Sequence, residues 1–271
     1  GTQDLHVKLE KTIARFKHTQ AALYFQTGFA ANSGSIPQLA GEGDLLISDE
    51  LNHGSIIDGV RLSKAERAIF KHKDMQDLER VLREAQAKNY KKIYVLTDGV
   101  FSMDGDIAPL DKIEKIAHQY NAFVYVDDAH GDGVLGENGR GIVSHFSLEG
   151  KIEAEMGTFS KGFGVVGGYV AGSSALYEFL QNKARTFLLS GSAPPATVAA
   201  CTAAIELLEK DGSLVRKLWE NTKYYKGQLK AMGFDTGESE TPITPIMLGE
   251  SKLAQDFAKE LFSEGVFALP I

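Results

Sequence analysis

Short apolar segments alternate with amphipathic segments along most of the chain, and this alternation limits the fold more than any other feature of the sequence. Residues 122–126 form an uncharged run of Ala, Phe, Val, Tyr and Val, which indicates a strand buried on both faces. Strands that alternate with helices predict an α/β fold with a mostly parallel central sheet and helices on both faces. Sheets of this kind bind ligands beyond the carboxyl ends of their strands.

The apolar spacing also predicts where the elements and domains lie. We expect strands at 21–25, 44–48, 92–96, 122–126, 155–159, 168–171 and 244–248, and the start of one more at 265–271. We expect helices at 4–16, 75–87, 110–120, 195–210, 218–232 and 252–263. These elements predict a large domain over 1–211 and the beginning of a smaller α/β domain over 212–271. Because both ends look cut, we expect an internal piece of a longer polypeptide.

Composition excludes several classes of partner. The formal net charge is −7, which argues against nucleic acid because phosphate binding needs clustered Lys and Arg. No apolar stretch approaches the ~20 residues of a membrane span. Cys201 is the single cysteine, so the chain forms no internal disulfide, and we expect a reducing, cytoplasmic location.

An aspartate and a lysine carry the strongest chemical signal. Asp127 ends the apolar strand, and Lys161 follows the next expected strand. Lysine can form a Schiff base with the aldehyde of pyridoxal phosphate (PLP), while aspartate can pair with the protonated pyridine nitrogen. Taken alone, Lys161 between glycines is also typical of a solvated surface residue, and Asp127 of a turn or cap. The pair together predicts a PLP site.

Further side chains fit the same site. His130 can hydrogen-bond the phenolic oxygen of the cofactor, and His53 can stack on its ring, although His53 could equally cap a helix. Gly28 and Phe29 follow Thr27 at the expected start of a helix, where free N–H groups favour a phosphate. Thr158 adds a hydroxyl that could bind it.

Three alternatives compete with these interpretations. A metal site built from Asp127 or Asp128 with His130 lacks a third ligand at a helpful spacing, so we expect no metal. Residues 162–167 match the G-x-G-x-x-G dinucleotide pattern, but a strand rather than a helix is expected after them. Residues 104–106 resemble part of a calcium loop without its other acids, which indicates a turn.

The motifs together resemble the α-oxoamine synthase family of fold-type I PLP enzymes. The resemblance extends over nearly the whole chain and is carried by residues 1–6, 48–59, 97–106, 126–136, 139–141, 157–172 and 190–195. It implies that Lys161 is the Schiff-base lysine, that Asp127 is the partner of the pyridine nitrogen, and that His53 stacks on the ring. It also implies cofactor contacts for seven further residues, which are His130 and Ser102 on the phenolic side, Gly28, Phe29 and Thr158 at the phosphate, and Ser190 and Ser192 at the phosphate of a neighbouring subunit.

Within the family, the sequence is most similar to glycine C-acetyltransferase, which implies condensation of glycine with acetyl-CoA, or the reverse reaction in threonine degradation. The resemblance further implies a homodimer with shared active sites. The alternative within the family is 8-amino-7-oxononanoate synthase, which joins L-alanine to a pimeloyl thioester in biotin synthesis. Remoter alternatives are an NAD-dependent oxidoreductase and an inactive partner subunit, although such subunits typically lack the lysine. The family's carboxylate-binding arginine falls outside this chain, so no arginine here is given that role.

Overall fold

The computed structural model describes residues 1–271, which form two compact units. The first unit comprises residues 1–101 and 107–217, and the second comprises residues 102–106 and 218–271. The first unit contains the sheet and is the larger one.

The first unit is built on a seven-stranded sheet with the order β1-β7-β6-β5-β4-β2-β3. The strands β2 to β6 run parallel, and β7 pairs antiparallel with both β1 and β6. The prediction of a mostly parallel sheet is therefore confirmed. The strands are β1 (Ala21–Phe25), β2 (Leu45–Asp49), β3 (Glu66–Phe70), β4 (Ile93–Asp98), β5 (Phe123–Asp127), β6 (Ala154–Thr158) and β7 (Gly168–Gly172).

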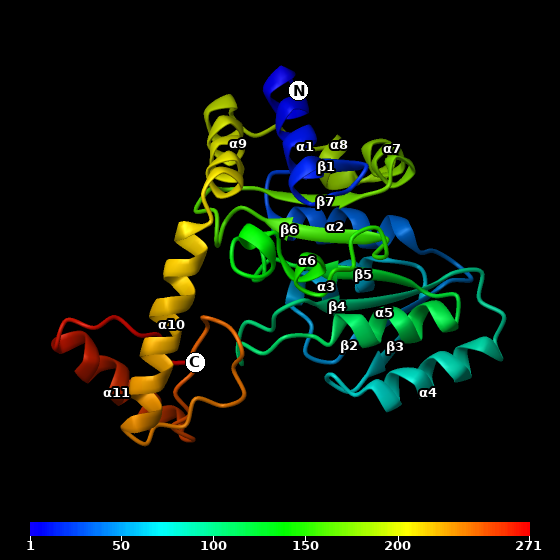
Figure 1. Cartoon of the computed structure of the whole chain (residues 1–271). Helices are drawn as coiled ribbons and strands as arrows, with labels where there is room; N and C mark the ends of the chain where they lie inside the picture. Colours follow the sequence, from blue (N-terminus) through cyan, green and yellow to red (C-terminus); the bar gives the residue numbers. More distant parts are fainter. The chain divides into compact units, whose positions relative to one another are not determined.

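Helices cover the two faces of this sheet (Figure 1). The helix α2 packs against β1, β6 and β7 and against α3, whereas α1 packs against β1 and α9, α4 against β3, and α5 against β5. The bounds are α1 (Asp4–Phe16), α2 (Gly28–Leu39), α3 (Gly54–Leu62), α4 (Met75–Gln86), α5 (Leu110–Gln119), α6 (Ile142–His145), α7 (Ser174–Lys183), α8 (Arg185–Leu188) and α9 (Pro195–Lys210), with a short 3₁₀ turn at Glu137–Gly139.

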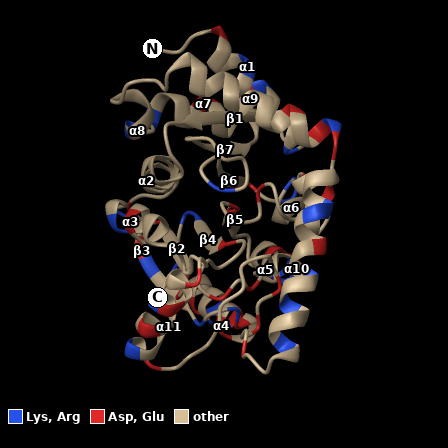
Figure 2. Ribbon diagram, turned by 90° about the vertical axis from the view of Figure 1, so that its left-hand side faces the viewer, with Lys and Arg blue, Asp and Glu red and all other residues tan.

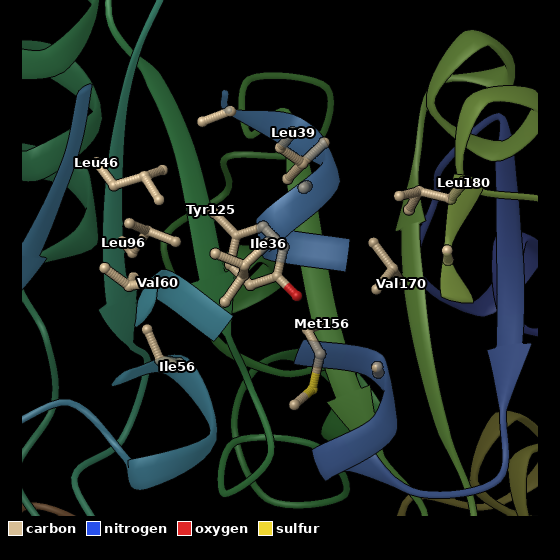
Figure 3. Packing of buried hydrophobic residues seen from close by; sticks show 14 of the residues in the cluster. Ile36, Leu39, Leu46, Ile56, Val60, Leu96, Tyr125, Met156, Val170 and Leu180 are labelled. Atoms are coloured by element: carbon tan, nitrogen blue, oxygen red, sulfur yellow. The ribbon is translucent and has the colours of Figure 1, made fainter. Parts of the chain in front are cut away.

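One apolar cluster joins α2, α3 and α7 to the sheet. Ile36 and Leu39 of α2 contact this cluster together with Ile56 of α3 and Leu180 of α7, and alternate strand residues complete it (Figure 3). Alternation places every second strand residue on the same face, so Tyr125 of β5 lies on the α2 side. The loss of apolar surface from water in this cluster fixes α2 and α3 on the sheet.

Charged residues of both signs lie along the outer helices (Figure 2), and on α4 they stand at helical spacing. Arg80 pairs with Asp77 and Glu84, and Arg83 pairs with Glu79. Exposed pairs of this kind contribute only about 0.3–0.5 kcal/mol each, so α4 is held mainly by its buried apolar residues.

The second unit contains most of α10 (Ser213–Ala231) and all of α11 (Ser251–Ser263). The strand expected at 244–248 is wrong, and residues 265–271 also form no strand. The apolar spacing there was suggestive, but Pro245 lacks the N–H that a paired strand uses, and neither segment has a partner strand in the described residues. No helix of the structure is long and apolar enough to cross a membrane.

Candidate active site

Two aspartates lie side by side at the carboxyl ends of the parallel strands β4 and β5. Asp98 is the register partner of Asp127, and both side chains are buried. Asp98 accepts a hydrogen bond from the backbone N–H of His53 at 2.6 Å. Burial raises the pKa of Asp98 well above its usual value, and the neighbouring Asp127 carboxylate raises it further. The two strand ends therefore concentrate negative charge in a low-dielectric position.

Asp127, the last residue of β5, and the following Asp128 direct their side chains to opposite faces of the sheet. Asp127 accepts hydrogen bonds from the side-chain amide of Asn32 at 2.7 Å and from the backbone N–H of Ala129 at 2.9 Å. Asp128 instead pairs with Lys17 at 3.0 Å. Strand alternation explains the separation, because Asp127 shares the face of Tyr125 and of α2.

Lys161 and His130 are brought into direct contact. Lys161 Nζ lies 2.7 Å from His130 Nε2. Burial lowers the pKa of Lys161, against the opposing influence of Asp127, Asp98 and Asp132. Burial and then the positive charge of Lys161 lower the pKa of His130 to about 4. His130 is therefore neutral at neutral pH, and its Nε2 accepts a hydrogen bond from the Lys161 amine.

We expect the titration of His130 to reveal this contact directly. In the protein without cofactor, ¹⁵N NMR of labelled histidine should give a His130 pKa of about 4, far below the ordinary value of 6.5. Lys161→Met should raise the pKa towards 6.5, because the positive neighbour is gone while burial remains. The ring of His145 packs on Phe146, and its ¹⁵N signals at a fixed pH provide the control for the labelling. A His130 pKa near 6.5 in both proteins would contradict the geometry.

His53 begins α3 and caps it. Its Nδ1 lies 3.2 Å from the backbone N–H of Ser55 and 2.7 Å from Ser55 Oγ. The interpretation of His53 as a helix cap is confirmed, and it is compatible with a second role. The backbone N–H of His53 donates to Asp98, the register partner of Asp127, so His53 lies at the same strand ends as the two aspartates.

The first turn of α2 has the features of an anion seat. Thr27 is the N-cap, and its hydroxyl accepts a hydrogen bond from the N–H of Ala30 at 3.0 Å. Gly28 and Phe29 precede Ala30 in the same turn, and their N–H groups have no partner within the helix. A Cβ added at Gly28 would lie 3.1 Å from Thr158 Oγ1, so glycine lets Thr158 approach the turn. The two parts of the expected phosphate site are thus adjacent.

Two expected contacts do not join this group, and a third belongs to the second unit. Ser190 and Ser192 line a different cavity of about 190 Å³ together with His6 and Tyr24. Ser102 belongs to the second unit, where it lines a cavity of about 550 Å³. The assignments of these three serines stay predictions.

Sequence reasoning missed a buried ionic cluster beside the site. Lys17, at the end of α1, pairs with Asp128, with Asp132 at 2.9 Å and with Glu155 at 2.5 Å. All four side chains are at most 3% exposed. Gly141 has a φ of +96°, and a Cβ there would lie 1.7 Å from Asp128 Oδ2, so the cluster requires glycine. The two adjacent acids at 127–128 were the only sequence signal for it.

Comparisons with known proteins agree in family. The model of the family described as aminotransferase class I and II matches residues 1–271. The 8-amino-7-oxononanoate synthase of Thermosipho melanesiensis is 55% identical over 271 residues, which are all of this chain and 69% of that protein. 8-amino-7-oxononanoate synthase 1 of Bacillus subtilis is 52% identical over 271 residues, again all of this chain and 69% of that protein.

Solved structures are similar over the same length. A serine palmitoyltransferase from S. paucimobilis with bound PLP and myriocin has a TM-score of 0.94 and 36% identity, covering 99% of this chain and 70% of that one. The 8-amino-7-oxononanoate synthase of Francisella tularensis has a TM-score of 0.85 and 28% identity, covering 98% of this chain and 77% of that one.

These relatives correct one expectation. The prediction of glycine C-acetyltransferase activity, with glycine, acetyl-CoA and threonine degradation, is wrong, because the similar curated proteins are 8-amino-7-oxononanoate synthases. The motifs behind that prediction surround the cofactor, and cofactor contacts do not report which acyl chain or amino acid is used. The correction therefore concerns only the expected substrates, and it does not alter the expected contacts to the cofactor.

Proposed function

Because the chain belongs to the aminotransferase class I and II family, we propose that it is a PLP-dependent C-acyltransferase that makes 8-amino-7-oxononanoate from L-alanine and a pimeloyl thioester. The observation that carries this proposal is the 55% identity to a protein of that name over the full length of the chain. The sheet and its helices have the fold-type I architecture of PLP transferases.

The residues present fit the cofactor. Asp127 is 2% exposed, and its two hydrogen-bond donors, Asn32 and Ala129, are neutral. A buried carboxylate with neutral partners is costly, and the protonated ring nitrogen of PLP would supply the missing cation. The free N–H groups of α2 suit a phosphate dianion, and the adjacent Thr158 hydroxyl, which donates to the carbonyl of Gly167 at 2.8 Å, would turn to donate to the phosphate. The donor set thus matches both ends of PLP.

The proposed roles follow from these positions. Lys161 would carry the cofactor, Asp127 would hold its ring nitrogen protonated, and Gly28, Phe29 and Thr158 would hold its phosphate. His53 and His130 would contact its ring and its phenolic oxygen. When bound, PLP supplies an electron sink for the bond broken at the substrate's Cα.

Lys161 is the proposed base that removes the proton from the Cα of L-alanine. Burial lowers the pKa of its amine, which increases the neutral fraction that can accept a proton. His130 accepts a hydrogen bond from the same amine and stays neutral, so the pair holds the amine in place without competing for its proton at neutral pH.

We further propose that two copies of the chain form a homodimer. Leu188 and Leu189 expose their side chains just before Ser190 and Ser192. Burial of these leucines against a second copy would bring the two serines towards the phosphate site of that copy. The single cysteine, Cys201, is a free thiol and is consistent with the predicted cytoplasmic location.

A spectroscopic titration tests the substrate assignment. The protein with PLP bound should change its visible absorbance at lower concentrations of L-alanine than of glycine or L-serine. Product analysis with pimeloyl and acetyl thioesters should then show 8-amino-7-oxononanoate as the main product. L-serine is included because the similar solved structures are serine palmitoyltransferases. Preference for glycine with acetyl-CoA, or for L-serine with a long acyl chain, would refute the assignment while leaving the cofactor site intact.

A further inference from the structure

Asn32 connects Asp127, the proposed partner of the cofactor's ring nitrogen, to Ser55, which is the hydrogen-bond partner of His53. It is fully buried on α2, next to Ser55 in the first turn of α3 and Tyr125 of β5. Figure 3 shows Tyr125 directed from β5 towards α2. Asn32 thereby joins its own helix, α2, to α3 and to β5.

The partners of Asn32 leave only one orientation for its amide. Asp127 Oδ2 lies 2.7 Å from Asn32 Nδ2, and a carboxylate can only accept, so the NH₂ group must face Asp127. The hydroxyl of Tyr125 donates to Asn32 Oδ1 at 2.8 Å, which fixes the carbonyl on the other side. The second hydrogen of the NH₂ group is then directed to Ser55 Oγ at 2.9 Å.

This orientation determines where the hydrogen of Ser55 goes. Because Ser55 Oγ accepts from Asn32, its own hydrogen is free to be donated to His53 Nδ1 at 2.7 Å. The backbone N–H of Ser55 also donates to His53 Nδ1, at 3.2 Å. With two donors directed at it, Nδ1 carries no hydrogen, and the hydrogen of the neutral imidazole is on Nε2.

We infer that Asn32 is a positioning residue that holds His53, through Ser55, as the tautomer with its hydrogen on Nε2. The hydrogen bonds run from Tyr125 and Asp127 through Asn32 and Ser55 to His53. Their use in the reaction rests on the proposed function: His53 would present an N–H donor, and not a lone pair, to the bound cofactor and substrate.

The tautomer can be measured without the cofactor. In protein labelled with ¹⁵N-histidine, two-bond ¹H–¹⁵N correlations distinguish the two tautomers, and the signals missing in His53→Gln identify His53. The wild-type protein should show His53 with its hydrogen on Nε2. A majority of the Nδ1–H form in the wild type would overturn the inference.

Asn32→Asp is the informative variant. Aspartate has the same shape as asparagine, but an oxygen takes the place of the NH₂ group that donates to Ser55 Oγ. The hydroxyl of Ser55 should then donate its hydrogen to this oxygen instead of to His53. Ser55 Oγ could then accept from Nδ1–H, but the backbone N–H of Ser55 still donates to Nδ1, so the share of the Nδ1–H form should rise from the wild-type level to give a mixture of the two tautomers. Asn32→Leu, which adds no buried acid, should give a mixture and replaces the first variant if that fails to fold.

Asn52→Asp is the matched control. Asn52 is also buried, but its amide contacts Ser48, Leu96 and Asp98 and neither the ring of His53 nor the carboxylate of Asp127. It should leave His53 in the Nε2–H form. If the Asn32 variants keep the wild-type tautomer, the role of Asn32 is refuted. Failure of the proposed function has a different signature, namely absence of PLP absorbance or of 8-amino-7-oxononanoate synthesis in the wild-type protein.

Discussion

Lys161→Ala is expected to abolish turnover, with a loss of at least about 10⁴-fold, while the protein remains folded. The loss is large because the same amine is proposed to carry the cofactor and to move the proton. The fold should persist because Lys161 lies at the surface with its side chain only partly buried, and the side chain hydrogen-bonds to His130 alone. Steady-state turnover, with circular dichroism and thermal unfolding as checks of the fold, measures both parts.

The control for this variant is Lys151→Ala, which removes an exposed lysine from a turn. It should retain normal turnover. Borohydride reduction of the wild-type protein with PLP should also add the mass of reduced PLP to the peptide that contains Lys161, and not to that peptide's alanine variant. Turnover that survives in Lys161→Ala, or label found on another lysine, would refute the assignment.

Lys17→Met is expected to cause the largest loss of stability, about 3–5 kcal/mol in the free energy of unfolding. Lys17 is the cation of a cluster with three buried carboxylates, and its amine also donates to the carbonyl of Arg140. Without it, Asp128, Asp132 and Glu155 would be buried with no cation beside them. Chemical denaturation of the wild type and the variant measures the difference.

The loss should depend on pH in a definite direction. Burial raises the pKa values of Asp128, Asp132 and Glu155 in the folded protein. The folded state therefore binds more protons than the unfolded state, and the free energy of unfolding falls as pH rises through the folded pKa values. Removal of Lys17 raises these pKa values further, so the deficit should grow as pH rises through the folded pKa values of the three carboxyl groups.

Two further variants test whether the loss of stability comes from the buried cluster around Lys17. Lys11→Met changes an exposed lysine on the same helix and should have little effect on stability. Asp132→Asn added to Lys17→Met should recover part of the loss, because one uncompensated charge is removed. A deficit below about 1 kcal/mol, or one that does not vary with pH, would show that the cluster does not bear on stability as described.

Periodicity predicted the strongly amphipathic elements well and the weakly patterned ones poorly. Helix α1 and strand β1 have the expected bounds because apolar residues recur clearly in them, and helix α9 has them because Pro195 marks its first turn and its sequence is rich in alanine. Strand β3 was not predicted, since it is an edge strand with mostly exposed side chains. The start of helix α2 after Thr27 was predicted but its extent was not, because Gly28, Asn32, Gly34 and Pro37 lower its helix propensity, and packing on the sheet outweighs that preference.

The site was predictable only where a residue type implied chemistry by itself. Lys161 and His130, which the sequence placed in one site, are in contact, and Gly28 adjoins Thr158. Asn32 and Lys17 were missed because a lone asparagine or lysine has no distinguishing neighbours in the sequence. Their partners are assembled by long-range pairing of helices and strands, which a local pattern does not contain.

The edge strand β1 has a consequence for how the chain folds during synthesis. Ala21 at its start pairs with Gly172 at the end of β7, so β1 has no sheet partner until most of the first unit has left the ribosome. Contacts between such distant residues slow folding, because the ends of a long loop must meet first. Until then the apolar residues of α1 and β1 are exposed to other chains. Nascent chains that end before β7 should therefore be the ones most in need of a chaperone.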